Sequence, residues 1–313
     1  MNKLAIVIPA YKATYLDAAL DSICNQTNLN FNLYIGDDNS PENLEKIIAR
    51  YSDKVNLTYV KFSENLGGHN LVNQWNRCLK MTKDESWIWL FSDDDIMDKR
   101  CVEYFYNAVL KENKPDIFRF NIKVINHDNK IIDDTISFPK VLNADDFLTL
   151  KLSGKIKSYV VEYIFRKTKE FQFVNFPIAW YSDVATIMIS AKENSIHTID
   201  NGFVAWRRSD INISPNYRDK NIFDQKIKAS YDFLKWVMMN DFNKNNLGNT
   251  IVLLIRSVTY EYANYKNISI REAWKSIMLF IDYSIHNSAV KISYTTKIYL
   301  FIYLIYIRNF KVK

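Results

Sequence analysis

The sequence predicts an α/β fold: a mostly parallel, mixed sheet flanked by helices, with a C-terminal helical extension. Over the first 115 residues, short apolar runs alternate with stretches that carry apolar residues at helical spacing. Strands separated by helices need crossover connections, which produce a parallel sheet. From about residue 219 only helical patterns remain. With 313 residues and 48% hydrophobic content, the chain can bury a large core.

The elements of the first half are expected in strict alternation. Strands are predicted at residues 4–11, 31–38, 55–62 and 87–92. Helices are predicted at 16–27, after Ser40 as N-cap and Pro41 as first helical position, and from the Gly67–Gly68 turn to about 82. The glycine pair either permits close backbone approach to a ligand or forms a plain turn. Trp87 and Trp89 alternate within their strand, which favours a place in the core.

The second half begins with a looser pattern and ends in helices. A hairpin is predicted around 127–129, a helix from 143, strands near 158–167 and 196–207, and a helix that begins at Ser182 or Asp183. Amphipathic helices are predicted at 222–240, 248–265 and 269–286. We therefore expect one domain over residues 1–215 and a helical region with a basic amphipathic tail over residues 216–313.

Charge and cysteine content exclude several classes of protein. The net charge is +6, but residues 291–313 alone carry five cations and no acid. No basic stripe runs through the main body, so a nucleic-acid partner is not expected. The three cysteines form no CxxC pair and indicate neither a disulfide framework nor a zinc site. Residues 1–12 lack a signal-peptide pattern, which predicts a cytoplasmic protein.

Acidic residues gather where neighbouring strands are predicted to end. The segment WIWLFSDDDIMD places Asp93, Asp94 and Asp95 after the fourth strand, and Asp37 and Asp38 end the second. Like charges this close resist ionising together unless water or a cation lies among them. In parallel sheets, ligands bind beyond the carboxyl ends of the strands. Single aspartates often cap helices or form turns, but two clusters at one sheet edge favour a ligand site.

Six motifs occur in an order that resembles a known family. In sequence they are VIPAYK, IGDDNS, ENLGG, SDDDIMD, YSD and WRRSDINIS. Together, over roughly residues 3–215, they resemble the family 2 glycosyltransferases, whose catalytic domain has the Rossmann-like GT-A fold. The resemblance implies an enzyme of the hexosyltransferase type. It would use a nucleotide-sugar donor, with UDP favoured, and Mg²⁺ or Mn²⁺, and it would invert the sugar on transfer to an acceptor hydroxyl.

The resemblance also implies roles for residues on the donor side. Pro9 and Tyr11 match the first loop, where the tyrosine lies against the nucleotide base. Asp38 matches the acid that accepts a hydrogen bond from the base, and Asp93 falls where the ribose is held. Arg77, in NQWNRCLK, is a candidate contact to the diphosphate or the base. Its alternative is an ordinary solvated helix arginine.

On the metal and acceptor side, the resemblance matches four further residues. Asp94 matches the metal ligand and Asp95 the acid that faces the sugar or the acceptor. Asp183 matches the catalytic base, and Arg207 the arginine of the motif that closes over the site. The chemistry is consistent, because a divalent cation neutralises the departing diphosphate and a separate carboxylate takes the proton of the acceptor hydroxyl.

Two positions depart from the family pattern, and two aromatic residues stand next to the base. Ser182 replaces the acid that usually precedes the base, and Ser209 replaces an expected histidine. These changes leave reduced metal dependence open. Trp180 and Tyr181 stand just before Ser182 and Asp183, and a ring there could stack on the acceptor sugar. A packing role in the core is the alternative.

The apolar segment at residues 292–308 has two interpretations. Its longest uncharged run, 298–307, is half of the roughly 20 residues that a bilayer span needs. It either packs on the preceding helices or lies on an anionic membrane surface, through residues 291–313. Family 2 enzymes often use saccharide or lipid-linked saccharide acceptors, as in the synthesis of capsule, O-antigen or exopolysaccharide. That resemblance favours membrane contact and a peripheral place at the inner face of the plasma membrane.

Three other functions were weighed. A nucleotidyltransferase would need a glycine- and lysine-rich loop after the first strand, where PAYKATY has no glycine. A phosphoacceptor receiver domain would carry its acid pair after the first strand. A degenerate transferase-like module that binds a nucleotide or supports a membrane complex is consistent with Ser182 and Ser209, while Asp94 and Asp183 favour an enzyme.

Overall fold

The computed structural model describes residues 3–111, 115–134, 138–192, 195–209, 219–240, 242, 246–288 and 290–310. Two compact units can be separated by their internal contacts. The sheet unit comprises Met1–Ala144, Ile156–Asn175 and Ser182–Ser209, and the helical unit comprises Asp145–Lys155, Phe176–Tyr181 and Asp210–Lys313. The boundary expected at residue 215 lies near the start of the last of these segments. Two segments before residue 215 also belong to the helical unit. A division into two consecutive domains assigns them to the other unit.

Four parallel strands form one half of the sheet, as the alternating pattern predicted. They are β1 (Leu4–Ala10), β2 (Phe31–Asp37), β3 (Asn56–Lys61) and β4 (Trp87–Leu90). Their spatial order is β3-β2-β1-β4, and Leu4 of β1 lies opposite Phe31 and Trp87. β1 is therefore paired on both sides, which explains why its sequence is apolar throughout rather than alternating.

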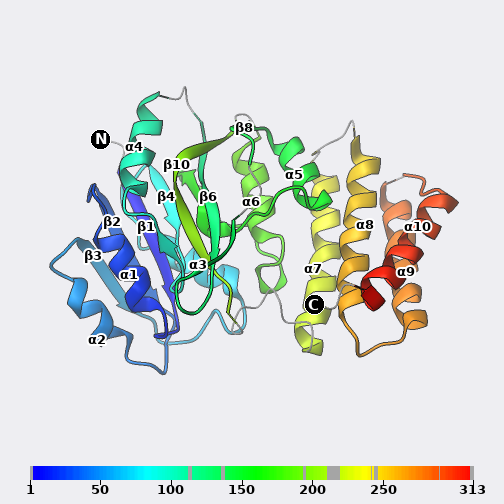
Figure 1. Ribbon diagram of the computed structural model, residues 1–313, viewed down its shortest axis with the longest axis horizontal. Coiled ribbons are helices and arrows are strands. Elements are labelled where there is room, and N and C mark those ends of the chain that lie inside the picture. The colour runs from blue at the N-terminus through cyan, green and yellow to red at the C-terminus, as the bar shows by residue number, and fades with distance from the viewer. Residues whose placement is uncertain are drawn as a thin grey trace. The chain divides into compact units, whose positions relative to one another are not determined.

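The other half of the sheet mixes strand directions. It contains β5 (Ile96–Met97), β6 (Ile117–Ile125), β7 (Ile131–Asp134), β8 (Val141–Leu142), β9 (Tyr163–Arg166) and β10 (Ile196–Arg207). β9 is antiparallel to both β4 and β6, while β10 is parallel to β6. The carboxyl ends of β1, β2, β4, β6 and β10 therefore lie along one edge of the sheet (Figure 1). This edge holds the predicted acids.

The sheet unit also contains five α-helices within its described residues. They are α1 (Leu16–Cys24), α2 (Leu44–Ile48), α3 (Leu71–Leu79), α4 (Cys101–Lys111) and α6 (Ser182–Ser190). Two predicted starts were wrong. α2 is capped by Asn43, whose side chain accepts from the Lys46 amide, and not by Ser40. α3 is capped by Asn70 in the same way, three residues after the start expected at the glycine pair.

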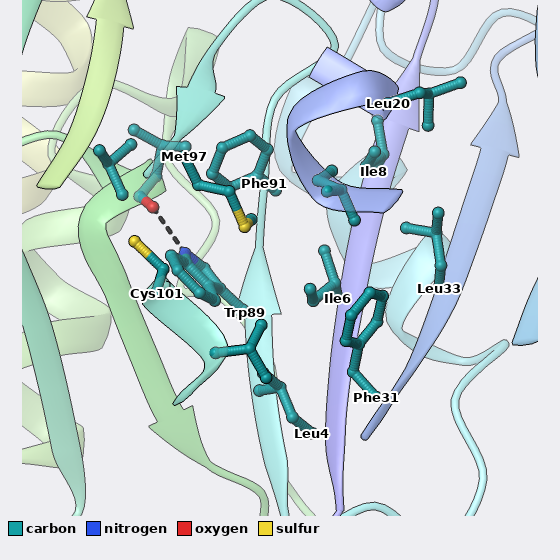
Figure 2. Close-up of a cluster of buried hydrophobic side chains, with 14 of the residues drawn as sticks. Leu4, Ile6, Ile8, Leu20, Phe31, Leu33, Trp89, Phe91, Met97 and Cys101 are labelled. Atoms are coloured by element: carbon teal, nitrogen blue, oxygen red, sulfur yellow. Dashed lines mark hydrogen bonds between the residues drawn. The ribbon is translucent and has the colours of Figure 1, made fainter. Parts of the chain in front are cut away.

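The core of the sheet unit packs around β1 and β4. Trp87 and Trp89 are fully buried, as predicted. The Trp89 ring stacks on Phe120 at 5.4 Å, and its Nε1–H donates to the Val161 carbonyl at 2.7 Å. Figure 2 shows this ring beside Phe91, on the same face of the sheet as Ile6 of β1. Because both tryptophans are committed to packing, neither is a platform for a ligand.

The helical unit consists of packed helices. They are α5 (Ala144–Ser153), α7 (Lys220–Met239), α8 (Leu247–Asn264), α9 (Ile270–Ser288) and α10 (Tyr294–Phe310). α8, α9 and α10 pack against one another (Figure 1), and Leu300, Leu304 and Ile307 of α10 are buried. The packing expected as one alternative for the last segment is thus present. Among the described residues, no helix is long and apolar enough to cross a membrane.

Candidate active site

Asp93 joins the loop after β4 to the loop after β1. Its Oδ2 accepts hydrogen bonds from the backbone amides of Tyr11 and Lys12, at 2.8 and 2.9 Å. Burial and the charge of Asp94 raise the pKa of Asp93 to about 6, although the two amides favour the ionised form. Pro9 lies within β1, opposite Gly36 of β2. Asp93 thus fixes the first loop.

Asp94 and Asp95 follow Asp93 in the chain but differ in exposure. Asp94 is partly exposed, and its Oδ1 accepts a hydrogen bond from the Ser92 hydroxyl. Asp95 is only 2% exposed, and its Oδ1 accepts from the backbone amide of Arg207 at 2.7 Å. Burial and the neighbouring Asp94 charge raise the pKa of Asp95 well above its ordinary value. This burial does not support the expectation that Asp95 faces the sugar or the acceptor.

Arg207, at the end of β10, binds the backbone of the acidic loop that follows β4. The side chain is fully buried. Its Nε donates to the Asp94 carbonyl at 2.7 Å, its Nη1 to the Asn126 carbonyl at 2.7 Å and its Nη2 to Asn129 Oδ1 at 2.6 Å. The guanidinium also lies over the Tyr15 ring, 4.1 Å from its centroid. Arg207 therefore ties the loop after β4 to the turn between β6 and β7.

Asp38, after β2, binds the segment that precedes α3. Its Oδ1 accepts from the Leu66 amide and its Oδ2 from the Gly67 amide, both at 2.8 Å. A side chain at residue 67 would place its Cβ 2.5 Å from Asp38 Oδ2, so glycine is required for this close approach. Burial raises the pKa of Asp38, against the opposing effects of the two amides and of Arg77. The preceding acid, Asp37, is fully buried and accepts from the Tyr59 hydroxyl.

Arg77, on α3, is not an ordinary solvated helix arginine. Its Nη2 lies 2.6 Å from Asp38 Oδ1, and its Nε donates to Gln74 Oε1 at 2.7 Å. The guanidinium also lies over the Phe62 ring, 3.8 Å from the centroid. These contacts hold a cation beside the Asp38 carboxylate. The arginine is thus at the strand-end cluster, where the sequence analysis expected a base or diphosphate contact.

Asp183 lies in the first turn of α6 and is partly exposed. A carboxylate in this position is favoured by the helix dipole. The preceding Ser182 is fully buried, and its carbonyl accepts from the Thr186 hydroxyl at 2.7 Å. Ser182 therefore packs into the sheet unit, where a second charged carboxylate would be costly. The departure from the family pattern at residue 182 is consistent with this burial.

Trp180 and Tyr181 belong to the helical unit and are held within it. The Tyr181 ring stacks on Phe233 of α7 with 4.6 Å between centroids, and its hydroxyl lies 2.9 Å from Ser257 Oγ. Burial raises the pKa of Tyr181 to about 12. Lys226 Nζ lies 4.4 Å from the centroid of the Trp180 ring. Both rings thus make packing contacts, the alternative that the sequence analysis left open.

The acids fit a single-carboxylate metal site rather than a cage. Among the described residues, no group of three or more His, Cys, Asp or Glu side chains is arranged to hold a metal ion. Asp93 and Asp95 each bind backbone amides through one oxygen, whereas the partly exposed carboxylate of Asp94 accepts from the Ser92 hydroxyl. Mg²⁺ and Mn²⁺ accept one or two carboxylates and fill their shells with water and phosphate oxygens. Asp94 is suited to this role.

A separate cavity in the sheet unit has a volume of about 670 Å³. Its lining comes from α3, from residues 166–175 and from α6, and includes Asn76, Phe171 and Thr186. None of the predicted site residues lines it. The candidate active site is therefore identified by the acids at the strand ends and not by this cavity.

Several residues that shape the site were not found by sequence reasoning. Ser92, Tyr15 and Asn129 contact the acidic loop or its arginine, and Phe62 lies under Arg77. The turn containing Asn129 was predicted, but the pattern gave no indication that it binds Arg207. A serine directly before an acid cluster is a signal that could have suggested the Ser92 contact.

The sheet order and the strand-end acids define an α/β protein with a candidate ligand site at one sheet edge, and comparison with known proteins gives its family. The model of glycosyl transferase family 2 matches residues 5–178. The chain belongs to this family and is a glycosyltransferase. As expected from the resemblance, its fold is the GT-A fold.

Similarity to individual proteins agrees with this assignment. The UDP-Glc:α-D-GlcNAc-diphosphoundecaprenol β-1,3-glucosyltransferase WfgD of Escherichia coli is 24% identical over 273 residues, which are 84% of this chain and 98% of WfgD. Three further relatives, uncharacterized glycosyltransferases of Mycoplasma genitalium and two Rickettsia species, are 31–32% identical over 114–116 residues, which are 35–36% of this chain. The chain spans only 34–38% of the length of these three proteins.

Two solved structures show the same fold at low identity. TarS of S. aureus in complex with UDP-GlcNAc aligns with a TM-score of 0.55 and 17% identity, covering 96% of this chain and 81% of the TarS chain. The mannosyltransferase PcManGT of Pyrobaculum calidifontis, in complex with GDP-Man and Mn²⁺, aligns with a TM-score of 0.51 and 12% identity, covering 100% of this chain and 88% of its own. These likenesses concern the fold.

Proposed function

We propose that this glycosyltransferase moves a hexosyl group from a UDP-sugar to a hydroxyl of a lipid-linked saccharide, with inversion, during assembly of a bacterial surface polysaccharide. WfgD, by its name, uses UDP-Glc and a GlcNAc-diphosphoundecaprenol acceptor. The TarS structure contains UDP-GlcNAc. Because the acceptor is lipid-linked, the proposal places the enzyme in the cytoplasm, peripheral to the inner face of the plasma membrane.

The position of Asp38 after β2 and of Asp93 and Asp94 after β4, at one edge of the sheet, carries this proposal. Tyr11 would lie against the base, and Asp38 would accept a hydrogen bond from uracil N3–H. Each carboxylate oxygen has two lone pairs, so Asp38 can bind the base while it keeps the amides of Leu66 and Gly67. Asp93 would hold the ribose of the nucleotide.

Asp94 would hold the Mg²⁺ or Mn²⁺ ion that the family resemblance implies. When bound, the ion supplies Lewis-acid stabilisation of the departing diphosphate. Asp95 and Arg207 would position the acidic loop. The Arg207 side chain donates to the backbone carbonyl of Asp94, and the Arg207 backbone amide donates to the carboxylate of Asp95. Arg77 would add a positive charge next to the base.

Asp183 would act as the general base. Its carboxylate takes the proton of the acceptor hydroxyl while the hydroxyl oxygen attacks the anomeric carbon from the face opposite the diphosphate. The new glycosidic bond forms as the bond from the anomeric carbon to the phosphate oxygen breaks, and UDP leaves. A single displacement of this kind inverts the anomeric configuration.

The proposal is tested by following release of nucleotide diphosphate from UDP-Glc, UDP-GlcNAc, UDP-Gal and GDP-Man, with Mn²⁺, Mg²⁺ or EDTA. The acceptor is a GlcNAc-diphospho-lipid, and NMR determines the anomeric configuration of the product. We expect turnover with one UDP-sugar, a β-linked product from an α-linked donor, and a decrease with EDTA. Tight UDP binding without turnover of any donor would instead indicate a catalytically degenerate binding module.

A further inference from the structure

Helix α10 is apolar on two opposite sides, of which only one is covered. Leu300, Leu304 and Ile307 are 0–1% exposed and pack within the helical unit. The rest of the helix does not turn polar, as an amphipathic surface helix would. A helix with this composition is expected to have a partner on its second side.

The second side carries a stripe of large apolar side chains at four-residue spacing. Tyr294, Ile298, Ile302 and Tyr306 are 78%, 43%, 59% and 53% exposed. They are joined by Tyr299 and Phe301, which are 48% and 36% exposed. At 3.6 residues per turn, the six positions fall in an arc of about 160°, opposite the three buried residues. We call these six residues the α10 exposed face.

This concentration of apolar surface is local. Of the fourteen large hydrophobic residues that are exposed among those the structure describes, six lie on α10. The others, such as Leu110, Ile189 and Met239, are spread over several elements. Scattered exposed hydrophobic residues are normal for a monomer, whereas a contiguous patch marks an interaction surface.

Charge identifies the partner that fits the α10 exposed face. The last acid in the sequence is Asp282, and the following residues include Lys291, Lys297, Arg308, Lys311 and Lys313. A second copy of the chain docked through this face would bring like charges together. An anionic lipid surface attracts them, and tyrosine is favoured at the bilayer interface because its ring is apolar and its hydroxyl remains hydrated.

We propose that α10 is a membrane-docking helix that lies parallel to an anionic bilayer, with its exposed face in the headgroup region. Its 17 residues are too few for a span, and its opposite face is already packed, so the geometry fits an interfacial helix. The docking surface goes beyond the transfer reaction itself. It rests on the proposed function in one respect, because it explains how the catalytic site would reach a lipid-linked acceptor.

Vesicle co-sedimentation of the full chain tests the inference. We expect wild type to bind vesicles of phosphatidylcholine with 30% phosphatidylglycerol, and Ile298→Glu/Ile302→Glu to bind at least tenfold more weakly. Leu110→Glu/Met239→Glu is the matched control, because it places two glutamates at sites that are 85% and 72% exposed elsewhere on the chain. It should bind as wild type does. Lys291→Gln/Lys297→Gln should weaken binding to the anionic vesicles by about fivefold per lysine, with no change in binding to vesicles without phosphatidylglycerol.

Two outcomes would overturn the inference. One is equal sedimentation of wild type and Ile298→Glu/Ile302→Glu. The other is a wild-type dimer that the same variant dissociates in analytical ultracentrifugation, without vesicle binding, since the face would then join two copies. Hydrolysis of the sugar donor in vesicle-free buffer separates this question from the proposed function. Vesicle binding by a chain that hydrolyses no donor would refute the function and leave the docking surface intact.

Discussion

Three adjacent aspartates have three different environments. Asp93 accepts two backbone amides, Asp94 is partly exposed beside Ser92, and Asp95 is buried against the Arg207 amide. Each additional charge raises the cost of ionising its neighbours, and the amides partly offset that cost. Asp93 and Asp94 are both partly exposed, but among the hydrogen bonds of the described residues only Asp94 binds no backbone amide, while Asp93 and Asp95 fix the loop. Different substitutions at this cluster should therefore have different effects.

The role proposed for Asp183 predicts a separation of catalysis from donor binding. Asp183→Asn should lower the rate of transfer at least 100-fold, as expected when a general base is lost, while the Kd for the UDP-sugar changes less than twofold in calorimetry. Asp200→Asn, at an exposed position of β10, is the control and should retain both properties. A comparable loss of donor affinity in Asp183→Asn would show that the residue is misassigned.

The hydrogen bonds of the Arg207 side chain predict that replacing this residue causes a large loss of stability. Arg207→Gln removes the donors that satisfy the carbonyls of Asp94 and Asn126, and lost hydrogen bonds to a charged group cost about 1.5–3 kcal/mol each. We expect the free energy of unfolding in urea to fall by about 2–4 kcal/mol. Its neighbour Arg208 is exposed, so Arg208→Gln should stay within about 0.5 kcal/mol of wild type. Similar values for the two variants would refute the anchoring role.

At the scale of elements, sequence periodicity predicted the long, regular parts of the fold. β1–β4, the hairpin at the end of β6 and the helices α7–α9 follow from apolar spacing and turn signals. β5 and β8 contain two residues each, which is too short for any period to be read. The antiparallel direction of β9 arises from pairing with β4 and β6, which are distant in sequence. The start of α2 was misplaced because proline at a turn resembles proline at a helix start.

The site was predictable in position but not in detail. Acids at strand ends follow from the α/β pattern together with the resemblance to the family. The burial of each acid does not follow from the pattern. Asp94 and Asp95 have the same local sequence environment, but Asp95 lies against the Arg207 amide and Asp94 beside Ser92. Arg77 shows the same limit, since its contact with Asp38 joins residues 39 positions apart. Motifs identify which residues meet, and tertiary packing decides which of their atoms remain accessible.

Glu85 predicts how pH affects the sheet at the edge opposite the candidate site. It is 3% exposed and accepts hydrogen bonds from the side chains of Asn32 and Tyr34 in β2. Burial alone would raise its pKa, but these hydrogen bonds and the Lys83 amide outweigh it and lower the pKa below the ordinary value of 4.5. The ionised form therefore stabilises the folded state above pH 4.5. This contribution is lost as the pH falls through the lowered pKa.

Glu85→Gln should accordingly reduce the free energy of unfolding by about 1–3 kcal/mol at pH 7. The difference from wild type should shrink as the pH falls below about 4.5 and vanish below the lowered pKa of Glu85, where both side chains are neutral. Urea titrations between pH 3 and pH 7 measure this directly. Glu45→Gln, at an exposed position of α2, should show little difference throughout. A pH-independent loss for Glu85→Gln would mean that packing, and not ionisation, is responsible.

For the whole molecule, the chain passes from the sheet unit to the helical unit and back before its final helices. The segments Asp145–Lys155 and Phe176–Tyr181 lie in the helical unit, while later residues complete the sheet unit. Phe176 contacts Phe233 of α7 at 5.9 Å, and Tyr181 stacks on the same ring. Phe176 and Tyr181, which lie within residues 1–215, therefore need a packing partner that lies beyond residue 215.

This arrangement predicts that a fragment of residues 1–215 will be unstable. It retains Phe176 and Tyr181 but lacks Phe233, so it should bind the dye ANS and unfold without the cooperativity of the full chain. In the full chain, Phe233→Ala should mimic part of this effect, with a loss of about 3–5 kcal/mol in the free energy of unfolding. A fragment that melts as sharply as the full chain and excludes ANS would show that the sheet unit is independent.

The same alternation bears on synthesis at the ribosome. The apolar side chains of residues 145–155 and 176–181 emerge before α7 to α10 of the same unit have been translated. Because domains generally fold as units as they leave the ribosome, these segments lack most of their unit until the last hundred residues are available. Slow translation or depletion of chaperones should therefore favour aggregation of the nascent chain. Recoverable yield should depend on how quickly the last hundred residues are made.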